Sequence, residues 1–418
     1  MTIKKHNWIA IVALMVFGML AMLHQWIGTR RPALSENNPS VEFSVTSQRD
    51  HGLGTLREAI YGADTAKGRV RIVFQVAYVE LSGPLPPLVN PLGTIIDGNA
   101  KDVELDAHRV SLGPVLDVDS PNSVLRGVKI VNSPDDAILV RSNGFHLIDS
   151  KILRCDSGVQ IADGITGVVI ERTALEENRL GVQIGRNVSG ILITRNQFTS
   201  QGEAGIWAVE GNLESYSSQD VRIRENVFER NHFGAVVSNI SALIEGNEFR
   251  DSGEAAVFLM GSGATVRGNR IQGGVGAGIF ADRTQRIVIE GNELDHNRTI
   301  GVLVRNSRNA VVSNNRAYRN GYGIAFVLGQ PQSANLAAEN TLISQLVDGI
   351  ILIGDSPLLR HNLIRANQQA GLRILDFVSN TGERIASSPY LERNSLLGNG
   401  SDRPVSGEYR TEVQGKSK

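Results

Sequence analysis

The sequence predicts an all-β solenoid, a right-handed parallel β-helix of about 11–12 coils, behind one N-terminal transmembrane helix. Three observations support this fold: a repeat of about 22 residues, an Asn at a fixed place in each repeat, and strands of alternating apolar and polar residues. A chain of 418 residues would ordinarily divide into two or three domains. Stacked repeats grow in one dimension, so that division does not apply here.

The repeat is clearest in SALIEGNEFRDSGEAAVFLMG (241–261) and RIVIEGNELDHNRTIGVLVRN (286–306). Each copy contains an alternating strand, an Asn, a short second strand, a polar turn, a Gly and a third strand. A period near 22 residues with three short strands excludes the longer helical repeats and propeller blades. The repeat region is expected to run from 123 to 400. Its marker residues are Asn226, Asn247, Asn269, Asn292, Asn315, Asn340 and Asn362.

The marker Asn is expected at a sharp turn, in the left-handed conformation that Asn tolerates, with its amides stacked as a ladder. A Gly precedes the third strand and is expected to give the chain a tight corner. Alternation then predicts that Val302 and Val304 point inward while Leu303 and Arg305 point outward. The corner glycines are Gly158, Gly181, Gly234, Gly278, Gly301, Gly323, Gly349 and Gly371.

Residues Trp8 to Gly28 contain no charged side chain, and 21 helical residues span about 30 Å, the thickness of a hydrocarbon core. A cleaved signal peptide is the alternative, although no A-x-A-like site follows. The sequence predicts a short cytoplasmic N-terminus (1–7), a transmembrane helix (8–28) and a polar linker (29–40). In either case the body of the protein is expected to be exported.

An N-terminal cap and the first coils precede these repeats and are expected to cover 41–122. Thr55 is expected to be the N-cap of a helix on which Leu56, Ile60 and Ala63 share one apolar face. Such a helix suits the open end of a solenoid, which would otherwise expose its core. Strands are expected at 71–76 and 93–100, and a polar C-terminal tail at 401–418.

DHGLGTLREAI (50–60), the IVF strand after it and IIDGNA (95–100) resemble the first segment of bacterial β-helix proteins of the pectate-lyase-like superfamily. The later coils resemble the parallel β-helix repeats of that superfamily. The resemblance covers roughly 40–400 and is specific for the fold. It implies lyases, hydrolases or C5-epimerases of acidic polysaccharides, or periplasmic proteins of exopolysaccharide assembly or export. It also implies a single-pass protein of the bacterial inner membrane with its β-helix in the periplasm.

Composition and motifs restrict the function. The chain has 42 basic and 43 acidic residues, a balance that argues against a nucleic-acid partner. Cys155 is the only cysteine, so no internal disulfide forms, and a core position is expected for it. The Gly-His-Gly of pectinase-type hydrolases and the Asp-Pro-His of alginate-type epimerases are absent. No residue spacing indicates a metal or another cofactor.

An apolar strip is expected on the outer side of the third strands, where Trp207, Phe258, Phe280 and Leu303 point outward. One interpretation is a platform on which sugar rings or a partner stack. The alternative is that the insertion 211–220 or the C-terminal tail folds over the strip. Both interpretations remain open at this stage.

Polar residues gather at the turn before the third strands. His296 with Asp295, facing Glu254 and Asp282 about one coil away, is the candidate catalytic cluster, and Arg305 lies beside Asp282. Solvated turn residues would explain the same pattern. Candidate substrate-binding residues are Trp207, Phe258, Phe280, Arg298 and His232.

These residues, taken with what the resemblance implies, leave two functions open. The first is a membrane-anchored periplasmic β-helix that binds polysaccharide or supports exopolysaccharide or envelope assembly, without strong catalytic activity. The second is a polysaccharide-modifying enzyme: a lyase, C5-epimerase or glycoside hydrolase. The expected partners are polysaccharide, the inner membrane through residues 8–28, and envelope or secretion-complex proteins.

Overall fold

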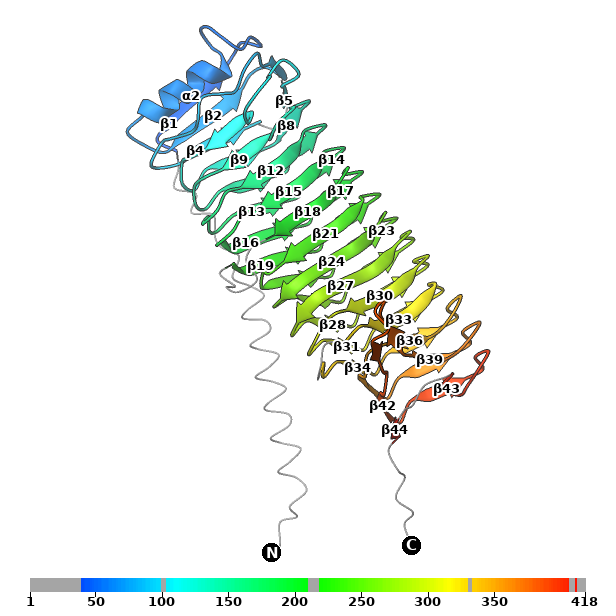
Figure 1. Ribbon diagram of the computed structural model, residues 1–418. Coiled ribbons are helices and arrows are strands. Elements are labelled where there is room, and N and C mark those ends of the chain that lie inside the picture. The colour runs from blue at the N-terminus through cyan, green and yellow to red at the C-terminus, as the bar shows by residue number, and fades with distance from the viewer. Residues whose placement is uncertain (1–38, 99–102, 210–217, 330–332, 406–409, 412–418) are drawn as a thin grey trace, which may run out of the picture. The chain divides into compact units, whose positions relative to one another are not determined.

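The computed structural model describes residues 39–98, 103–209, 218–329, 333–405 and 410–411. The chain from Val41 onward forms one compact unit, built from three long parallel sheets that we call A, B and C (Figure 1). Each coil adds one strand to sheet A, then one to B, then one to C. The expected parallel β-helix is therefore confirmed.

Sheet A contains sixteen strands. They are β1 (Val41–Val45), β2 (Val70–Phe74), β4 (Thr94–Asp97), β7 (Val124–Arg126), β10 (His146–Ile148), β13 (Val169–Glu171), β16 (Ser189–Thr194), β19 (Gln219–Arg224), β22 (Ala242–Glu245), β25 (Thr265–Arg267), β28 (Val288–Glu290), β31 (Val311–Ser313), β34 (Leu336–Ala338), β37 (Leu358–Arg360), β42 (Tyr390–Glu392) and β44 (Arg410–Thr411).

Sheet B contains fourteen strands. They are β3 (Tyr78–Glu80), β5 (Val103–Asp106), β8 (Val128–Val131), β11 (Lys151–Leu153), β14 (Ala174–Glu176), β17 (Gln197–Thr199), β20 (Val227–Glu229), β23 (Glu248–Arg250), β26 (Arg270–Gln272), β29 (Glu293–Asp295), β32 (Arg316–Tyr318), β35 (Thr341–Ile343), β38 (Leu363–Arg365) and β43 (Ser395–Leu397).

Sheet C contains twelve strands. They are β6 (Leu116–Val118), β9 (Ile138–Val140), β12 (Ser157–Ile161), β15 (Leu180–Ile184), β18 (Ala204–Val209), β21 (Phe233–Ser238), β24 (Ala255–Ser262), β27 (Ala277–Gln285), β30 (Ile300–Arg305), β33 (Tyr322–Val327), β36 (Ile350–Ile353) and β39 (Leu372–Leu375). A separate antiparallel hairpin pairs β40 (Phe377–Val378) with β41 (Arg384–Ile385).

The twelve strands of sheet C define twelve complete coils among the described residues, in agreement with the expected number. Sheets A and B extend further at both ends, with β1, β2 and β3 before the first complete coil and β42, β43 and β44 after the last. We call the turns from A to B, B to C and C to A the first, second and third corners. The membrane segment expected at 8–28 lies outside the described residues, and within them no helix is long and apolar enough to span a membrane.

The core is a continuous column of inward apolar side chains. Val302 and Val304 are at most 1% exposed, whereas Leu303 and Arg305 are half-buried on the outer side, as alternation predicts. Three inward Phe side chains of sheet B stack with ring centroids 4.7 and 4.5 Å apart, in the order Phe198, Phe228 and Phe249. Cys155 is also buried, as expected, and burial raises the pKa of its thiol to about 11.

A ladder of Asn side chains runs along the first corner. Nine stacked residues, Asn196 to Asn394, are joined by eight amide–amide hydrogen bonds of 2.8–3.1 Å. The expected left-handed conformation, however, is not at the ladder residue. It belongs to the residue before it, as at Glu225 and Gly246, with φ of 56° and 63°. The Asn is selected because its buried amide satisfies backbone groups of the neighbouring coils, not because it turns the chain.

The corner glycines also have another role than the one predicted. Gly234 lies within a strand of sheet C, as does Gly205 at the equivalent position one coil earlier, and neither has a positive φ. A Cβ on Gly205 would lie 2.7 Å from the ring of Phe228 and 2.7 Å from the carbonyl oxygen of Gly234. These glycines are required by close packing against the core and the next coil, so the explanation by a tight corner was wrong.

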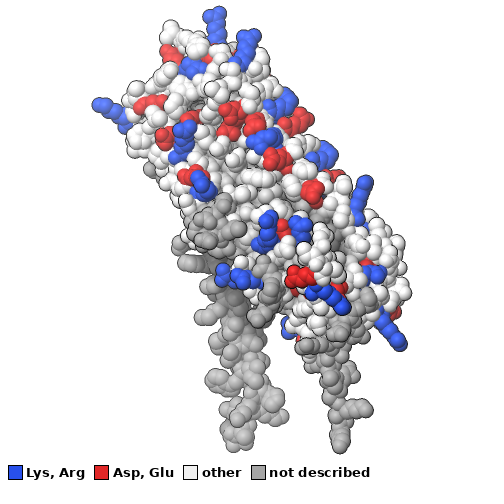
Figure 2. All heavy atoms as spheres, viewed as in Figure 1, with Lys and Arg blue, Asp and Glu red and all other residues white. Residues whose placement is uncertain are grey.

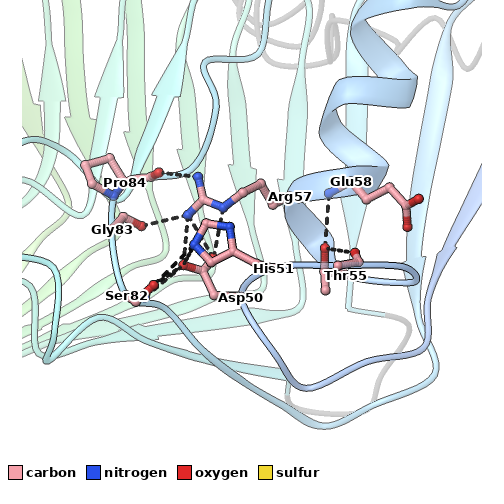
Figure 3. Close-up of polar contacts among 9 residues, drawn as sticks. Asp50, His51, Thr55, Arg57, Glu58, Ser82, Gly83 and Pro84 are labelled. Atoms are coloured by element: carbon pink, nitrogen blue, oxygen red, sulfur yellow. Dashed lines mark hydrogen bonds and ion pairs between the residues drawn. The ribbon is translucent and has the colours of Figure 1, made fainter.

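The N-terminal cap forms as predicted. Helix α2 (Leu56–Thr65) buries Leu56, Ile60 and Ala63, and Oγ1 of Thr55 accepts the N–H of Glu58 at 3.2 Å (Figure 3). The Glu58 carboxylate accepts the N–H of Gly54 at 2.5 Å, which completes a capping box in modified form.

The DHG segment before this helix has a structural role. The Asp50 carboxylate accepts hydrogen bonds from Arg57 at 2.8–3.1 Å and from the N–H and hydroxyl of Ser82 at 3.0 and 2.6 Å (Figure 3). Arg57 also donates to the carbonyl oxygens of Gly83 and Pro84. Asp50 and Arg57 therefore hold the start of the helix against the loop at 82–84.

Asp50, His51 and Ser82 do not form a catalytic triad. Nε2 of His51 lies 3.2 Å from the Asp50 carboxylate and 3.4 Å from the Ser82 hydroxyl. A relay requires the two partners on different ring nitrogens, and here the Ser82 hydroxyl donates directly to Asp50.

Candidate ligand-binding face

The outer side of sheet C presents a row of apolar side chains in strict register. Trp207 pairs with Val236, Val236 with Phe258, and Phe258 with Phe280. The row continues through Leu303, Ala325 and Ile351. Because parallel strands stack without offset, one position in the repeat becomes a line of side chains along the β-helix. We call this surface the apolar face.

Two hydrophobic clusters make up the apolar face, and both are separate from the core. One joins Trp207, Phe233 and Phe258 to buried Leu180, Ala204 and Val236. The other contains Ala277, Phe280, Ile300, Leu303, Tyr322, Ala325, Val327, Ile351, Ile353 and Leu375. Figure 2 shows few charged atoms over the middle coils of this side, between charged residues over the first coils and along the borders.

The aromatic rings of the apolar face contact one another. The centroids of Phe233 and Phe258 lie 5.9 Å apart and those of Phe258 and Phe280 5.1 Å apart, both pairs tilted. His232 packs edge-on against Phe233 at 4.8 Å. All three Phe side chains stay half-buried, so an apolar surface remains in contact with solvent.

Polar residues mark both ends of the row. Gln160 and Gln183 precede Trp207 in the same register, and Arg373 follows Ile351. Asp348 is fully buried and accepts hydrogen bonds from Arg373 at 2.6 and 3.0 Å. The row of outward apolar side chains is thus limited to the coils from β18 to β36.

Only part of each segment expected to cover the strip lies within the described residues. Most of the insertion at 211–220 lies outside the described residues. Ser401 and Val405, from the expected C-terminal tail, pair with Ala370 and Arg373 as a further rung beside β39. The described part of that tail therefore extends the sheets rather than lying over Trp207 or Phe258.

Asp282 and Arg305 do come together, beside the apolar face at the third corner. Asp282 is 3% exposed and accepts from Nε of Arg305 at 2.9 Å and from Nε of Arg283 at 3.2 Å. The guanidinium of Arg305 lies 4.8 Å from the centroid of the Phe280 ring. Burial alone would raise the pKa of Asp282, but the hydrogen bond and charge of Arg305 lower it below its ordinary value.

His296 and Asp295 form the second predicted contact. Nδ1 of His296 lies 2.9 Å from one Asp295 carboxylate oxygen, and Arg319 lies 3.3 Å from the other. His296 has φ of 54° and takes the left-handed position of the second corner. Its side chain is 55% exposed, so the imidazole is open to solvent.

The predicted catalytic cluster divides into these two groups. His296 precedes strand β30, whereas Arg305, the partner of Asp282, ends it. The strand between them is roughly 16 Å long at 3.3 Å per residue. Asp282 therefore does not face His296, because one lies at each long edge of sheet C. Glu254, His232 and Arg298 are exposed at the second corner, on the His296 side.

Sequence reasoning missed a second polar ladder, which runs along the second corner. Asn297 donates to Asn320 at 2.9 Å, Asn320 to Gln345 at 3.2 Å, and Asn367 to Asn399 at 2.7 Å. Each residue stands five positions after a residue of the first ladder, as Asn297 stands after Asn292. That constant spacing was the signal that could have revealed it. Arg283 and the buried pair of Asp348 and Arg373 were also missed.

Known proteins share this fold. The periplasmic alginate epimerase AlgG aligns with a TM-score of 0.51 at 16% identity, over 82% of this chain and 77% of the epimerase. A mannuronic acid specific polysaccharide family 6 lyase from human gut microbiota aligns with a TM-score of 0.52 at 12% identity, over 84% and 87%. At these identities the similarity shows the fold alone.

By sequence, the tail spike protein of Salmonella phage epsilon15 is 23% identical over 215 residues, which is 47% of this chain and 19% of the tail spike. The match thus spans about a fifth of that relative. The family described as right handed beta helix region matches residues 93–220 and 213–381, most of the described coils. With the three parallel sheets and the stacked polar ladders, this match shows that the chain belongs to the right handed beta helix family.

Proposed function

We propose that the protein binds a polysaccharide along the apolar face of sheet C. The observation that carries this proposal is the row of Trp207, Phe258 and Phe280, half-buried and in register along the β-helix. One face of a sugar ring is largely C–H and stacks on aromatic side chains, while its hydroxyl groups remain hydrated at the rim. A polymer with a regular repeat suits a surface that itself repeats from coil to coil.

The similar proteins support a polysaccharide ligand. Among them are an alginate epimerase and a mannuronic acid specific lyase, both built on a β-helix. The borders of the apolar face also carry polar groups suited to hydroxyl recognition: His232 and Arg298 at the second corner, and Arg305 at the third.

The proposed setting is the bacterial cell envelope. Residues 8–28 would anchor the chain in the inner membrane and leave the β-helix in the periplasm, where it would support assembly or export of an exopolysaccharide. The basis is the uncharged apolar stretch from Trp8 to Gly28. Protease protection of the full chain in intact spheroplasts, compared with lysed cells, tests this orientation.

Binding is tested with the full chain on a broad panel of immobilised bacterial polysaccharides. Trp207→Ala and Phe258→Ala should each weaken binding roughly tenfold or more, as expected for aromatic anchors at the centre of an interface. The matched control is Leu243→Ala, which removes a half-buried outward side chain from sheet A. If no polysaccharide binds, or if Leu243→Ala has the same effect as Phe258→Ala, the proposal is wrong.

A second candidate function, a polysaccharide-modifying enzyme, rests on the contact between His296 and Asp295. Nδ1 of His296 lies 2.9 Å from the carboxylate, and Nε2 is the nitrogen that this exposed imidazole would use for proton transfer. Unsaturated products and reducing ends should then appear when the full chain is incubated with uronate polymers, and His296→Ala should abolish them. Binding without turnover across the panel would leave the non-catalytic function.

A further inference from the structure

The third corner after β27 and β30 carries the strongest local excess of positive charge beside the apolar face. Among the described residues of five successive third corners (238–241, 260–264, 282–287, 305–310, and 327–329 with 333–335), the charged ones are one Asp and four Arg. They are Asp282, Arg283, Arg286, Arg305 and Arg308. The four arginines therefore exceed the acid by three charges.

These arginines belong to two adjacent coils. Asp282 pairs with Arg305 in the register of β27 and β30, and Gln285 forms a bridge with Arg308. The backbone N–H of Arg286 donates to the carbonyl oxygen of Arg308 at 3.2 Å. Stacking thus brings together side chains that are 22 or 23 residues apart in the sequence.

Asp282 orients two of the four guanidinium groups. Its carboxylate, 4% exposed, holds Arg305 and Arg283 through their Nε atoms, one on each oxygen. These bonds through Nε use none of the N–H donors on the terminal nitrogens, and the two arginine side chains are 42% and 64% exposed. Two guanidinium groups fixed on one buried carboxylate present a rigid set of N–H donors, the arrangement that favours bidentate oxyanion binding.

The backbone places this group at the edge of the apolar face. The register between β24 and β27 shifts between Met260 and Gly261, so that Met260 pairs with Asp282 and Gly261 with Thr284. The extra residue in β27 is Arg283, with φ of 51°. Such a bulge re-aims a side chain at the border of a sheet. Arg305 contacts the ring of Phe280, so the cationic group and the aromatic row are continuous.

We propose that Arg283 and Arg305, oriented by Asp282 and supplemented by Arg286 and Arg308, form an oxyanion-binding position for a polysaccharide that carries carboxylate or sulfate groups. This inference rests on the proposed function and specifies the ligand class. The sugar rings stack on Phe258 and Phe280, while an acidic substituent reaches the third corner. A bound oxyanion would offset part of the excess positive charge there.

The experiment compares acidic polymers with neutral polymers of the same backbone. The probes are uronate polymers, each beside its carboxyl-reduced form, and dextran sulfate beside dextran, all titrated against the full chain. We expect the acidic member of a pair to bind roughly tenfold or more tightly, because the charge-assisted hydrogen bonds exist only with the acid. That preference should decline as sodium chloride is raised.

Substitutions test which residues produce the preference for the acidic polymer. Arg283→Gln/Arg305→Gln should lose most of the preference for the acidic member of a pair, whereas the control Arg172→Gln/Arg195→Gln, which removes the same charge elsewhere, should keep it. Asp282→Asn adds net positive charge but releases the arginines, so it should weaken acidic binding; tighter binding would disprove the orienting role. Thermal unfolding of each variant confirms that it is folded.

Two further results distinguish failure of the oxyanion-binding position from failure of the proposed function. Equal binding of acidic and neutral polymers by the native chain, or an undiminished preference in Arg283→Gln/Arg305→Gln, overturns this inference and leaves the proposed function intact. Failure of every polymer to bind overturns the proposed function, and this inference with it.

Discussion

The side-chain amide of Asn292 donates to Oδ1 of Asn315 at 3.0 Å, and the backbone N–H of Asn292 donates to the same oxygen at 3.0 Å. Asn315 in turn donates to the carbonyl oxygen of Ile289 and to Asn340. One buried side chain therefore satisfies polar groups on the coils before and after its own. The same bonds recur along the first corner, so the ladder fixes the register of the stack.

Asn315→Ala should destabilise the β-helix by roughly 2–5 kcal/mol, because it leaves several buried polar groups without partners. The neighbouring substitution Asn314→Gly is the matched control. Asn314 is exposed with φ of 54°, and glycine occupies the equivalent place at Gly246, Gly268 and Gly291. Chemical denaturation followed by circular dichroism should show a loss for the first variant only, and an equal loss for both would contradict the ladder's role.

Gly205→Ala should cost about 1–3 kcal/mol through overpacking, although the backbone at Gly205 is one that alanine adopts without strain. The added Cβ would meet the Phe228 ring and the Gly234 carbonyl, both 2.7 Å away. Gly246→Asn is the opposite case, with φ of 63° and nothing within 4 Å of the added Cβ. It should be nearly neutral in thermal unfolding, since Asn314 occupies the equivalent site.

The solenoid, its coils and the inward side chains could be predicted from the sequence, because each depends on a short residue pattern that recurs in every repeat. Val302 and Leu303 face opposite ways for the simple reason that strands alternate. The reasons for individual residues were harder to predict. The role of Gly205 depends on Phe228, which lies on another sheet. The residues next to Gly205 in the sequence do not indicate that contact.

The candidate site was predictable only in part. Residues at one repeat position, such as Phe258 and Phe280, were correctly grouped, because register follows from the repeat. Asp282 and His296 were wrongly grouped, because their separation depends on where the chain leaves the strand. Arg283 escaped notice since the β-bulge that aims it is a property of the pairing between β24 and β27.

The buried carboxylate of Asp50 should make the cap sensitive to acid. Burial opposes its ionisation, but hydrogen bonds from Ser82 and Arg57 bring the pKa below its ordinary value of 3.8. Because the pKa of Asp50 is lower in the folded state than in the unfolded state, its carboxylate stabilises the fold fully at a pH above the unfolded-state pKa. This stabilisation is lost as the pH falls through the folded-state pKa. Asp50→Asn should thus cost roughly 2 kcal/mol at pH 7 and less at about pH 3.

Thermal unfolding at the two pH values measures this effect. His51→Ala is the control, because the His51 side chain is 70% exposed and contacts the same carboxylate. It should leave the midpoint nearly unchanged. An equal cost of Asp50→Asn at both pH values would show that the hydrogen bonds do not depend on ionisation.

Asp136 should have the opposite pH dependence. It precedes β9 and is 7% exposed, and burial raises its pKa from 3.8 to about 6. Because the folded state holds the proton more tightly than the unfolded state, stability is fully present below pH 3.8 and declines as pH rises to about 6. The loss above that pH is up to about 3 kcal/mol, at 1.36 kcal/mol per pKa unit.

Asp136→Asn removes the ionisation and should raise the thermal midpoint at pH 8 while leaving it nearly unchanged at pH 4. The neighbour Asp135 provides the control. Its carboxylate accepts the N–H of Asp136 at 2.9 Å and that of Gly113 at 3.0 Å, so Asp135→Asn removes a similar charge from the same turn together with one of the two acceptor oxygens. Asp135→Asn should therefore be destabilising at pH 8. If Asp136→Asn is also destabilising at pH 8, then the ionised carboxylate has a stabilising partner in the fold, and burial does not control its titration.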